Sequence, residues 1–201
     1  ALFLFTDADV HFAPQALRRA VEWMERDQLG HLSLLPRMPG KKLPYNAALA
    51  CFAAAFLGTL KAWKIGKPNS TAYGGVGAFS LVRRSDFDRT LGWEWLKMEV
   101  GDDVGLAMMM VRQSGAPSVF GTATNSLKLQ WYPDLTAMVR GLRKNAFGVM
   151  CGYSGFRLLT VLVALTCLLI GPALALYSGN PWACGAAAIA GFSVLVFAAV
   201  A

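Results

Sequence analysis

From Leu158 to Ala201 the sequence carries no charged side chain, so all 19 Lys and Arg and all 12 Asp and Glu residues lie before this tail. The apolar run 158–177 is long enough to cross a bilayer, which takes about 20 residues. A turn at 178–181 separates it from a second apolar run, 182–201. We therefore expect two transmembrane helices, the second one truncated, after a region of ordinary charge. This division excludes a disordered chain, a small disulfide scaffold and a uniformly soluble enzyme.

The net charge of +7 is concentrated in two segments that flank apolar stretches. Six cations and no acid lie between Pro36 and Lys67, and four cations and no acid lie between Arg140 and Arg157. This pattern is typical of contact with an anionic membrane surface, and a solvated basic face is the alternative. No basic tract alternates with aromatics, so we do not expect nucleic acid as a partner. Cations in front of the first span predict an integral protein of the inner or plasma membrane with its catalytic part in the cytoplasm.

Apolar runs and helical patterns alternate in the first part of the chain, which predicts an α/β fold. The strands expected from short apolar runs are 2–5, 31–35, 76–82, 118–120 and 126–131. The first of them is typical of a strand buried on both faces of a parallel sheet. Helical spacing predicts helices over 14–27, with Leu17, Val21 and Met24 on one face, and from Asp102 to about residue 115.

Two further helices are expected beside the basic segments. The charge-free stretch 47–60 is too short to span a bilayer. It is either a buried core helix or, with Tyr45 and Trp63 at its ends, an interfacial helix over 45–63. A basic amphipathic helix is expected at 136–147, inside a segment 136–157 that leads from a domain over 1–135 to the first span.

Asp7 and Asp9 directly follow the first predicted strand. Ligands of parallel α/β sheets bind at the carboxyl ends of strands. Two carboxylates two residues apart on a bend can converge on Mg²⁺ or Mn²⁺, which prefer oxygen ligands. Aspartates that cap turns produce the same pattern, so both interpretations stay open for Asp-x-Asp alone.

Asp102 and Asp103 form a second acidic pair at the start of a predicted helix. They either cap that helix, or one of them is a general base near the first pair. Neighbouring side chains on a helix diverge by about 100°. Asp103 shares its face with the apolar Leu106 and Met110, which follow it by three and seven residues. We therefore expect Asp103 to point inward and Asp102 to be placed as the cap.

Two other groups of residues could bind a ligand. Arg140 and Arg143 are three residues apart on one helical face and could bind a diphosphate or lipid phosphates. Trp93, Trp95 and Trp131 could stack on sugar faces, lie in a membrane interface or pack in the core.

The order of these segments resembles the family 2 glycosyltransferases. The segment from Phe5 to Asp9 is similar to their Asp-x-Asp segment, and Gly75 to Ser85, with Arg84-Ser85 at its end, is similar to their acceptor-side strand. Gly101 to Leu106 resembles their Glu-Asp-x-x-Leu segment, with Asp102 in place of Glu. Arg140-x-x-Arg143 resembles the Gln/Arg-x-x-Arg-Trp motif of the membrane-bound processive and ceramide-glucosyltransferase-like members, with Lys144 in place of Trp.

This resemblance implies a partial GT-A domain followed by an interfacial helix and two transmembrane helices. It implies an inverting, metal-dependent transfer from a nucleotide sugar to a membrane-associated lipid acceptor. Asp9, assisted by Asp7, would hold the metal at the donor diphosphate, and Asp103 would act as the base. Arg140 and Arg143 would bind the departing diphosphate. The residues implied on the acceptor side are Gly75, Gly77, Arg84, Trp93 and Asp102.

The sequence matches only part of the family pattern, and it leaves two other functions open. The family's N-terminal half, with its uridine-contacting Asp, is not matched, so this segment is not expected to be active alone. Asp7-x-Asp9 and Asp102-Asp103 also resemble motifs of haloacid-dehalogenase-type phosphatases, but the usual late acid is replaced by Leu106 and Ala107. A second alternative is a non-catalytic, transferase-like membrane scaffold or export component.

Overall fold

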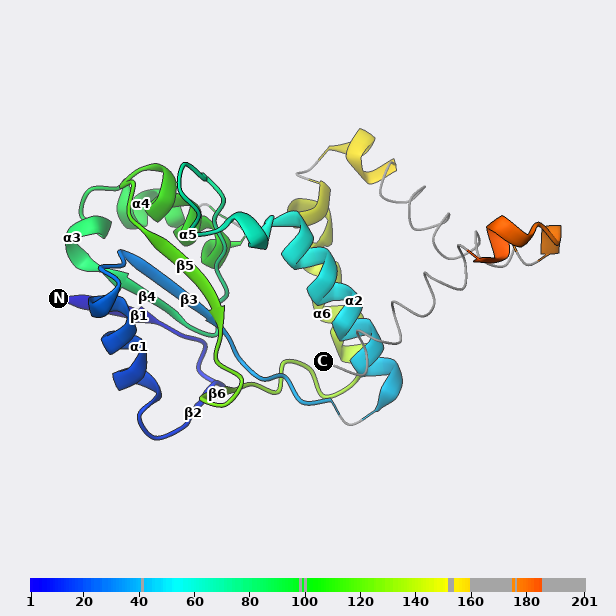
Figure 1. Ribbon diagram of the computed structural model, residues 1–201, viewed down its shortest axis with the longest axis horizontal. Helices are drawn as coiled ribbons and strands as arrows, with labels where there is room; N and C mark the ends of the chain where they lie inside the picture. The colour runs from blue at the N-terminus through cyan, green and yellow to red at the C-terminus, as the bar shows by residue number, and fades with distance from the viewer. Residues whose placement is uncertain are drawn as a thin grey trace. The chain divides into compact units, whose positions relative to one another are not determined.

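The computed structural model describes residues 1–40, 42–97, 99, 101–151, 154–159, 175 and 177–185. The chain divides into two compact units, Ala1–Pro39 with Ala55–Trp131, and Gly40–Ala54 with Tyr132–Ala201. The first unit contains a small sheet with helices on both faces and is therefore mixed α/β (Figure 1).

A four-stranded sheet lies at the centre of the first unit, in the order β1-β4-β3-β5 (Figure 1). Its strands are β1 (Leu2–Phe5), β4 (Ser80–Arg83), β3 (His31–Leu35) and β5 (Ser118–Thr122). β4 runs antiparallel to both of its neighbours, whereas β3 and β5 are parallel. The strand expected at 2–5 is present, but its expected place in a parallel sheet is wrong, because its partner β4 runs the other way. β1, β3 and β5 therefore end at the edge of the sheet where β4 begins.

Helices cover both faces of this sheet. α1 (Ala16–Arg26) packs on one face through Ala16, Ala20 and Met24. α3 (Arg84–Phe87), α4 (Gly92–Leu96) and α5 (Asp102–Arg112) contribute to the apolar cluster on the other face. The expected apolar face of α1 is only partly right, because Leu17 is 46% exposed and small alanines make the close contact with the sheet instead.

A two-stranded ribbon lies beside the main sheet and consists of β2 (His11–Phe12) and β6 (Leu127–Lys128). The strands are antiparallel, with His11 opposite Lys128. Arg37 adds backbone hydrogen bonds on the other side of β6: its N–H donates to the carbonyl of Leu127 at 2.8 Å, and its carbonyl accepts from the N–H of Leu129 at 2.9 Å. The end of β6 is thus tied to two different segments.

Helices dominate the described part of the second unit. α2 (Leu43–Thr59) begins there and runs on into the first unit, where the short 3-10 helix η1 (Ala62–Lys64) follows. α6 (Leu135–Cys151) is preceded by Asp134, whose Oδ1 accepts a hydrogen bond from the N–H of Ala137 at 2.8 Å. Such a bond satisfies one of the free N–H groups in the first turn of a helix.

The structure does not support the two expected transmembrane helices. Across the parts of the chain that the structure describes, no helix has both the length and the apolar character to cross a membrane. The uncharged helix α2 has 17 residues, which at 1.5 Å per residue gives about 26 Å, short of the roughly 30 Å of a hydrocarbon core. Most of the expected spans, 160–174, 176 and 186–201, lies outside the described residues.

A buried polar cluster links three neighbouring strands of the sheet, β4, β3 and β5. His31 on β3 is fully buried, and its two ring nitrogens lie 2.8 Å from the Ser118 hydroxyl on β5 and 2.9 Å from the Ser80 hydroxyl on β4. Burial lowers the pKa of His31 from 6.5 to about 4. The imidazole is therefore neutral over the physiological range and links three strands by side-chain hydrogen bonds.

This histidine makes the fold sensitive to acid. Below pH 6.5 the unfolded chain protonates His31, while the folded chain resists protonation until about pH 4. The full shift corresponds to about 3 kcal/mol of folding free energy, lost as the pH falls through that window. The raised pKa values of Asp7 and Asp103 act in the opposite direction. We therefore expect the difference in unfolding free energy between wild type and His31→Gln, measured by urea denaturation, to shrink between pH 6.5 and 4. Parallel pH profiles for the two proteins would contradict this assignment.

Candidate active site

Three segments meet at the edge where β1 ends and β4 begins. Asp7 and Asp9 follow β1, Gly75 to Gly77 precede β4, and Asp103 lies in the first turn of α5. The reversed direction of β4 explains the meeting, because the end of one strand and the start of its antiparallel neighbour lie side by side.

Hydrogen bonds through Gly77 join the two acidic segments. The N–H of Asp7 donates to the carbonyl of Gly77 at 2.9 Å, and the N–H of Gly77 donates to Oδ2 of Asp103 at 3.1 Å. The other carboxylate oxygen of Asp103 accepts from the N–H of Val104 at 2.7 Å. Asp103 therefore points inward, toward Gly77, as expected. Asp102 is exposed, and its Oδ1 accepts from the N–H of Asp103 at 3.1 Å.

A buried serine that the sequence analysis did not identify supports this arrangement. Ser33 on β3 is fully buried. Its hydroxyl accepts from the N–H of Val76 at 3.0 Å and donates to the carbonyl of Phe79 at 3.1 Å. These bonds attach the segment before β4 to the middle of the sheet. The available signal was a serine inside the apolar run 31–35, a position where an unpaired hydroxyl is costly.

The environment changes the acidity of two of these carboxyl groups. Burial, and after it the negative charges of Asp9 and Asp102, raises the pKa of Asp7 above its ordinary value. Burial is also the main cause that raises the pKa of Asp103, against the opposing hydrogen bonds from the N–H groups of Val104 and Gly77. A carboxylate with a raised pKa is a better proton acceptor, as a general base requires.

The two glycines of this segment differ in what a side chain would meet. A Cβ at Gly75 would overlap the backbone carbonyl of Asp103, whereas a Cβ at Gly77 would lie 2.9 Å from Oδ2 of Asp7. A backbone group cannot move aside cheaply, so we expect Gly75→Ala to lower the unfolding free energy by about 1–3 kcal/mol. Gly77→Ala should cost less stability and instead displace Asp7 and lower turnover.

Urea denaturation and an activity assay on both variants check this expectation. Gly58→Ala is the matched control, because a Cβ at this exposed helical position meets nothing within 4 Å. It should be stabilising by about 0.5–1 kcal/mol. Equal stabilities of the Gly75 and Gly77 variants would contradict the close approach of Gly75 to α5.

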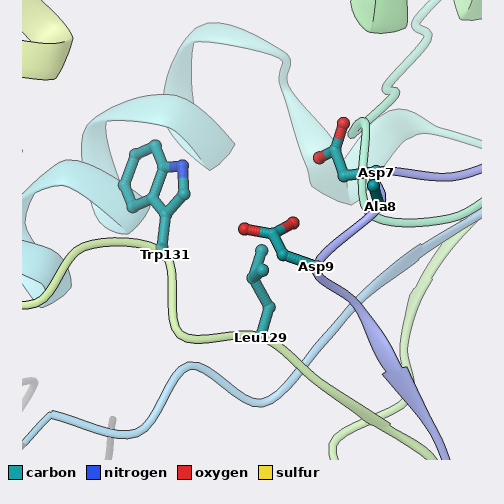
Figure 2. Close-up of a pocket in the computed structure, with 5 residues that line it drawn as sticks. All are labelled: Asp7, Ala8, Asp9, Leu129 and Trp131. Carbon is teal, nitrogen blue, oxygen red and sulfur yellow. The ribbon is translucent and has the colours of Figure 1, made fainter.

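An open pocket of about 480 Å³ lies next to Asp7 and Asp9. Its lining residues are Asp7, Ala8, Asp9, Leu129 and Trp131. Figure 2 shows the carboxylate of Asp9 directed toward the indole of Trp131, with Asp7 on the other side of Asp9. The pocket thus has an acidic wall, formed by the end of β1, and an apolar wall, formed by Leu129 and Trp131.

The acidic wall fits the expected Mg²⁺ or Mn²⁺ in part. Among the described residues, no three His, Cys, Asp or Glu side chains form a complete ligand set. Mg²⁺ in phosphate-transfer sites is commonly held by one or two carboxylates together with substrate phosphates and water. Asp7 and Asp9 line one pocket, and the negative charge of Asp9 adds to burial, the main cause, in raising the pKa of Asp7. A cation between them would relieve their mutual repulsion.

The other expected site residues lie at different places. Trp93 on α4 packs its ring 5.2 Å from that of Phe5, at the end of β1, and remains 53% exposed. Arg84 lies at the far end of β4 from Gly77, where it pairs with Asp88 at 3.3 Å. Trp93 therefore borders the acidic edge, and Arg84 is not brought to it.

Arg140 and Arg143 both lie exposed on α6. They belong to the second unit, whereas the carboxylates belong to the first. Their contact with a diphosphate held by Asp7 and Asp9 stays a prediction.

Neither a comparison with protein-family models nor a search of curated proteins finds a match for this chain. The functional argument therefore depends on the geometry of the site and on the motif resemblance.

Proposed function

We propose that this chain provides the catalytic edge of an inverting glycosyltransferase, which moves a sugar from a nucleotide-sugar donor to a hydroxyl group of a lipid acceptor. The observation that carries the proposal is the meeting of Asp7, Asp9, Gly77 and Asp103 at one edge of the sheet. Pockets of this kind, with convergent polar groups and perturbed pKa values, are typical of active sites.

In the proposed reaction, the carboxylate of Asp103 accepts the proton of the acceptor hydroxyl. The acceptor oxygen bonds to the anomeric carbon as the bond from that carbon to the phosphate oxygen breaks on the opposite face. The nucleoside diphosphate leaves, and the configuration at the anomeric carbon is inverted. Asp7 and Asp9 would hold a divalent cation, which supplies positive charge for the leaving diphosphate.

The acceptor is proposed to be a lipid because of the surface around α2. This helix carries no charged side chain from Leu43 to Thr59, and exposed lysines flank it at Lys42, Lys61 and Lys67. Trp63, just after it, is 60% exposed. Apolar helices with basic flanks and exposed Trp are typical of binding to anionic membrane surfaces.

The function is tested by measuring release of nucleoside diphosphate from UDP- and GDP-sugars by the full-length protein, with and without Mn²⁺. A glycosyltransferase is expected to hydrolyse one such donor slowly in a Mn²⁺-dependent reaction, and faster when a lipid acceptor extract is added. Hydrolysis of a phosphate monoester instead would favour the phosphatase alternative. No turnover of either substrate would favour the scaffold alternative.

A further inference from the structure

We infer that Trp131 forms the platform on which the transferred sugar ring of the donor lies, facing the carboxylates of Asp7 and Asp9. This inference rests on the proposed function. It gives a role to the apolar wall of the pocket, which the proposed reaction does not use.

The ribbon of β2 and β6 sets the position of Trp131. His11 pairs with Lys128 in antiparallel register, so residues before His11 run alongside residues after Lys128. Beyond this pair, Ala8 and Trp131 line the same pocket. The N–H of Leu129 also donates to the carbonyl of Arg37 at 2.9 Å. Trp131 therefore follows a segment fixed on both sides.

The residues around the indole define the opposite walls of the pocket. Trp131 is partly buried and Leu129 is buried, so the apolar wall is held by the protein and not free in solvent. Asp9 faces the indole across the pocket (Figure 2). A ligand in this space meets an aromatic surface on one side and carboxylate oxygens on the other.

A sugar ring matches both walls. The C–H groups on one face of a pyranose carry partial positive charge and pack on the negative face of an aromatic ring. Its hydroxyl groups donate hydrogen bonds, which ionised carboxylates only accept. A hydrocarbon chain in the same place would bury the carboxylates without hydrogen bonds, which is costly.

The donor sugar, in particular, suits the position. It is bonded directly to the terminal phosphate of the nucleotide, so it has to lie next to the group that Asp7 and Asp9 are proposed to bind. The pocket of about 480 Å³ includes both of these aspartates and Trp131. Pockets for small ligands commonly measure about 300–1,000 Å³.

The test compares the dissociation constants of a donor and of its nucleoside diphosphate, measured by calorimetry with Mn²⁺ on the full-length protein. The probes are UDP-glucose, UDP-galactose, UDP-N-acetylglucosamine and GDP-mannose, with UDP and GDP as their sugar-free partners. Trp131→Leu is expected to raise the dissociation constant of the donor about three- to tenfold. The dissociation constant of the nucleoside diphosphate should stay unchanged. Trp182→Leu is the matched control, because Trp182 is 87% exposed and outside the pocket. It should bind both probes as the wild type does.

A second measurement on the wild type covers the case that Trp131→Leu does not fold. The six tryptophans are labelled with 5-fluorotryptophan, and the fluorine resonance of Trp131 is assigned with Trp131→Phe. This resonance should shift with the donor and stay in place with the nucleoside diphosphate.

The outcomes separate the inference from the function on which it rests. Suppose that wild type binds a donor, but Trp131→Leu weakens the binding of donor and nucleoside diphosphate equally, or changes the binding of neither. The role of Trp131 as the sugar platform is then overturned, and the transferase proposal stands. A resonance that shifts equally with both probes overturns it too, because the indole then meets the nucleotide. If wild type binds no nucleotide sugar and no nucleoside diphosphate, both proposals fail.

Discussion

Replacement of Asp103 by asparagine is expected to lower kcat by about 10²–10⁴-fold, the usual contribution of a proton-transfer residue. Asparagine keeps the size of the side chain and can still accept the hydrogen bond from the N–H of Gly77. The local structure and donor binding should therefore survive. Steady-state kinetics for turnover and calorimetry for donor binding separate the two effects.

The pH dependence of turnover gives this prediction a second readout. Burial raises the pKa of Asp103, so turnover should fall with decreasing pH at a higher pH than an ordinary aspartate would give. This acid limb should disappear in Asp103→Asn. Asp102→Asn is the matched comparison, since Asp102 is the adjacent, exposed acid. It should retain most of the turnover. Because the charge of Asp102 helps to raise the pKa of Asp103, its removal should move the acid limb to lower pH. If Asp102→Asn abolished turnover and Asp103→Asn did not, the base would be misassigned.

Replacement of Asp9 by asparagine is expected to abolish turnover while the protein stays folded. Asp9 lies beside the pocket in a loop after β1, so its loss leaves the core of the sheet unchanged. The physical reason is the loss of one of two carboxylates that would hold the divalent cation at the leaving diphosphate. Paramagnetic resonance of Mn²⁺ in the presence of UDP should show weaker binding of the ion by the variant.

Chelation provides the control for this second prediction. Wild type treated with a chelator should lose activity and regain it with added Mn²⁺, whereas Asp9→Asn should not respond. Asp27→Asn, at an exposed aspartate in an ion pair with Arg26 at 2.7 Å, should behave as the wild type does. Full activity of chelator-treated wild type would remove the metal from the mechanism.

The acidic part of the site could be predicted from the sequence because local patterns determine it. An apolar run that ends in Asp7-Ala8-Asp9 forms β1 and its following loop, and the spacing of Leu106 and Met110 from Asp103 gives the inward face of α5. These features depend on neighbours within a few residues, which is the range over which side-chain periodicity carries information.

The remaining features depend on contacts between distant segments. An apolar run does not encode the direction of a strand, so the sequence does not predict that β4 is antiparallel to both of its neighbours. β2 and β6 have only two residues each, which is too short for any alternation, and the pocket wall at Trp131 depends on their pairing. The hydrogen bonds of His31 and Ser33 connect residues more than 40 positions apart. The charge-free tail predicted membrane spans from composition alone, which does not determine where helices begin and end.

The two walls of the pocket differ in how they are attached to the rest of the protein. The acidic wall is connected through Gly77 and Val76 to the fully buried Ser33. The apolar wall follows a ribbon of two residue pairs and two further backbone hydrogen bonds with Arg37. If the pocket binds a sugar as proposed, side-chain replacements at Leu129 or Trp131 could adapt it to sugars of different size or stereochemistry, because neither side chain makes the hydrogen bonds through Gly77 and Ser33. The reacting groups would keep their alignment, so a single scaffold could acquire new donor preferences without rebuilding its chemistry.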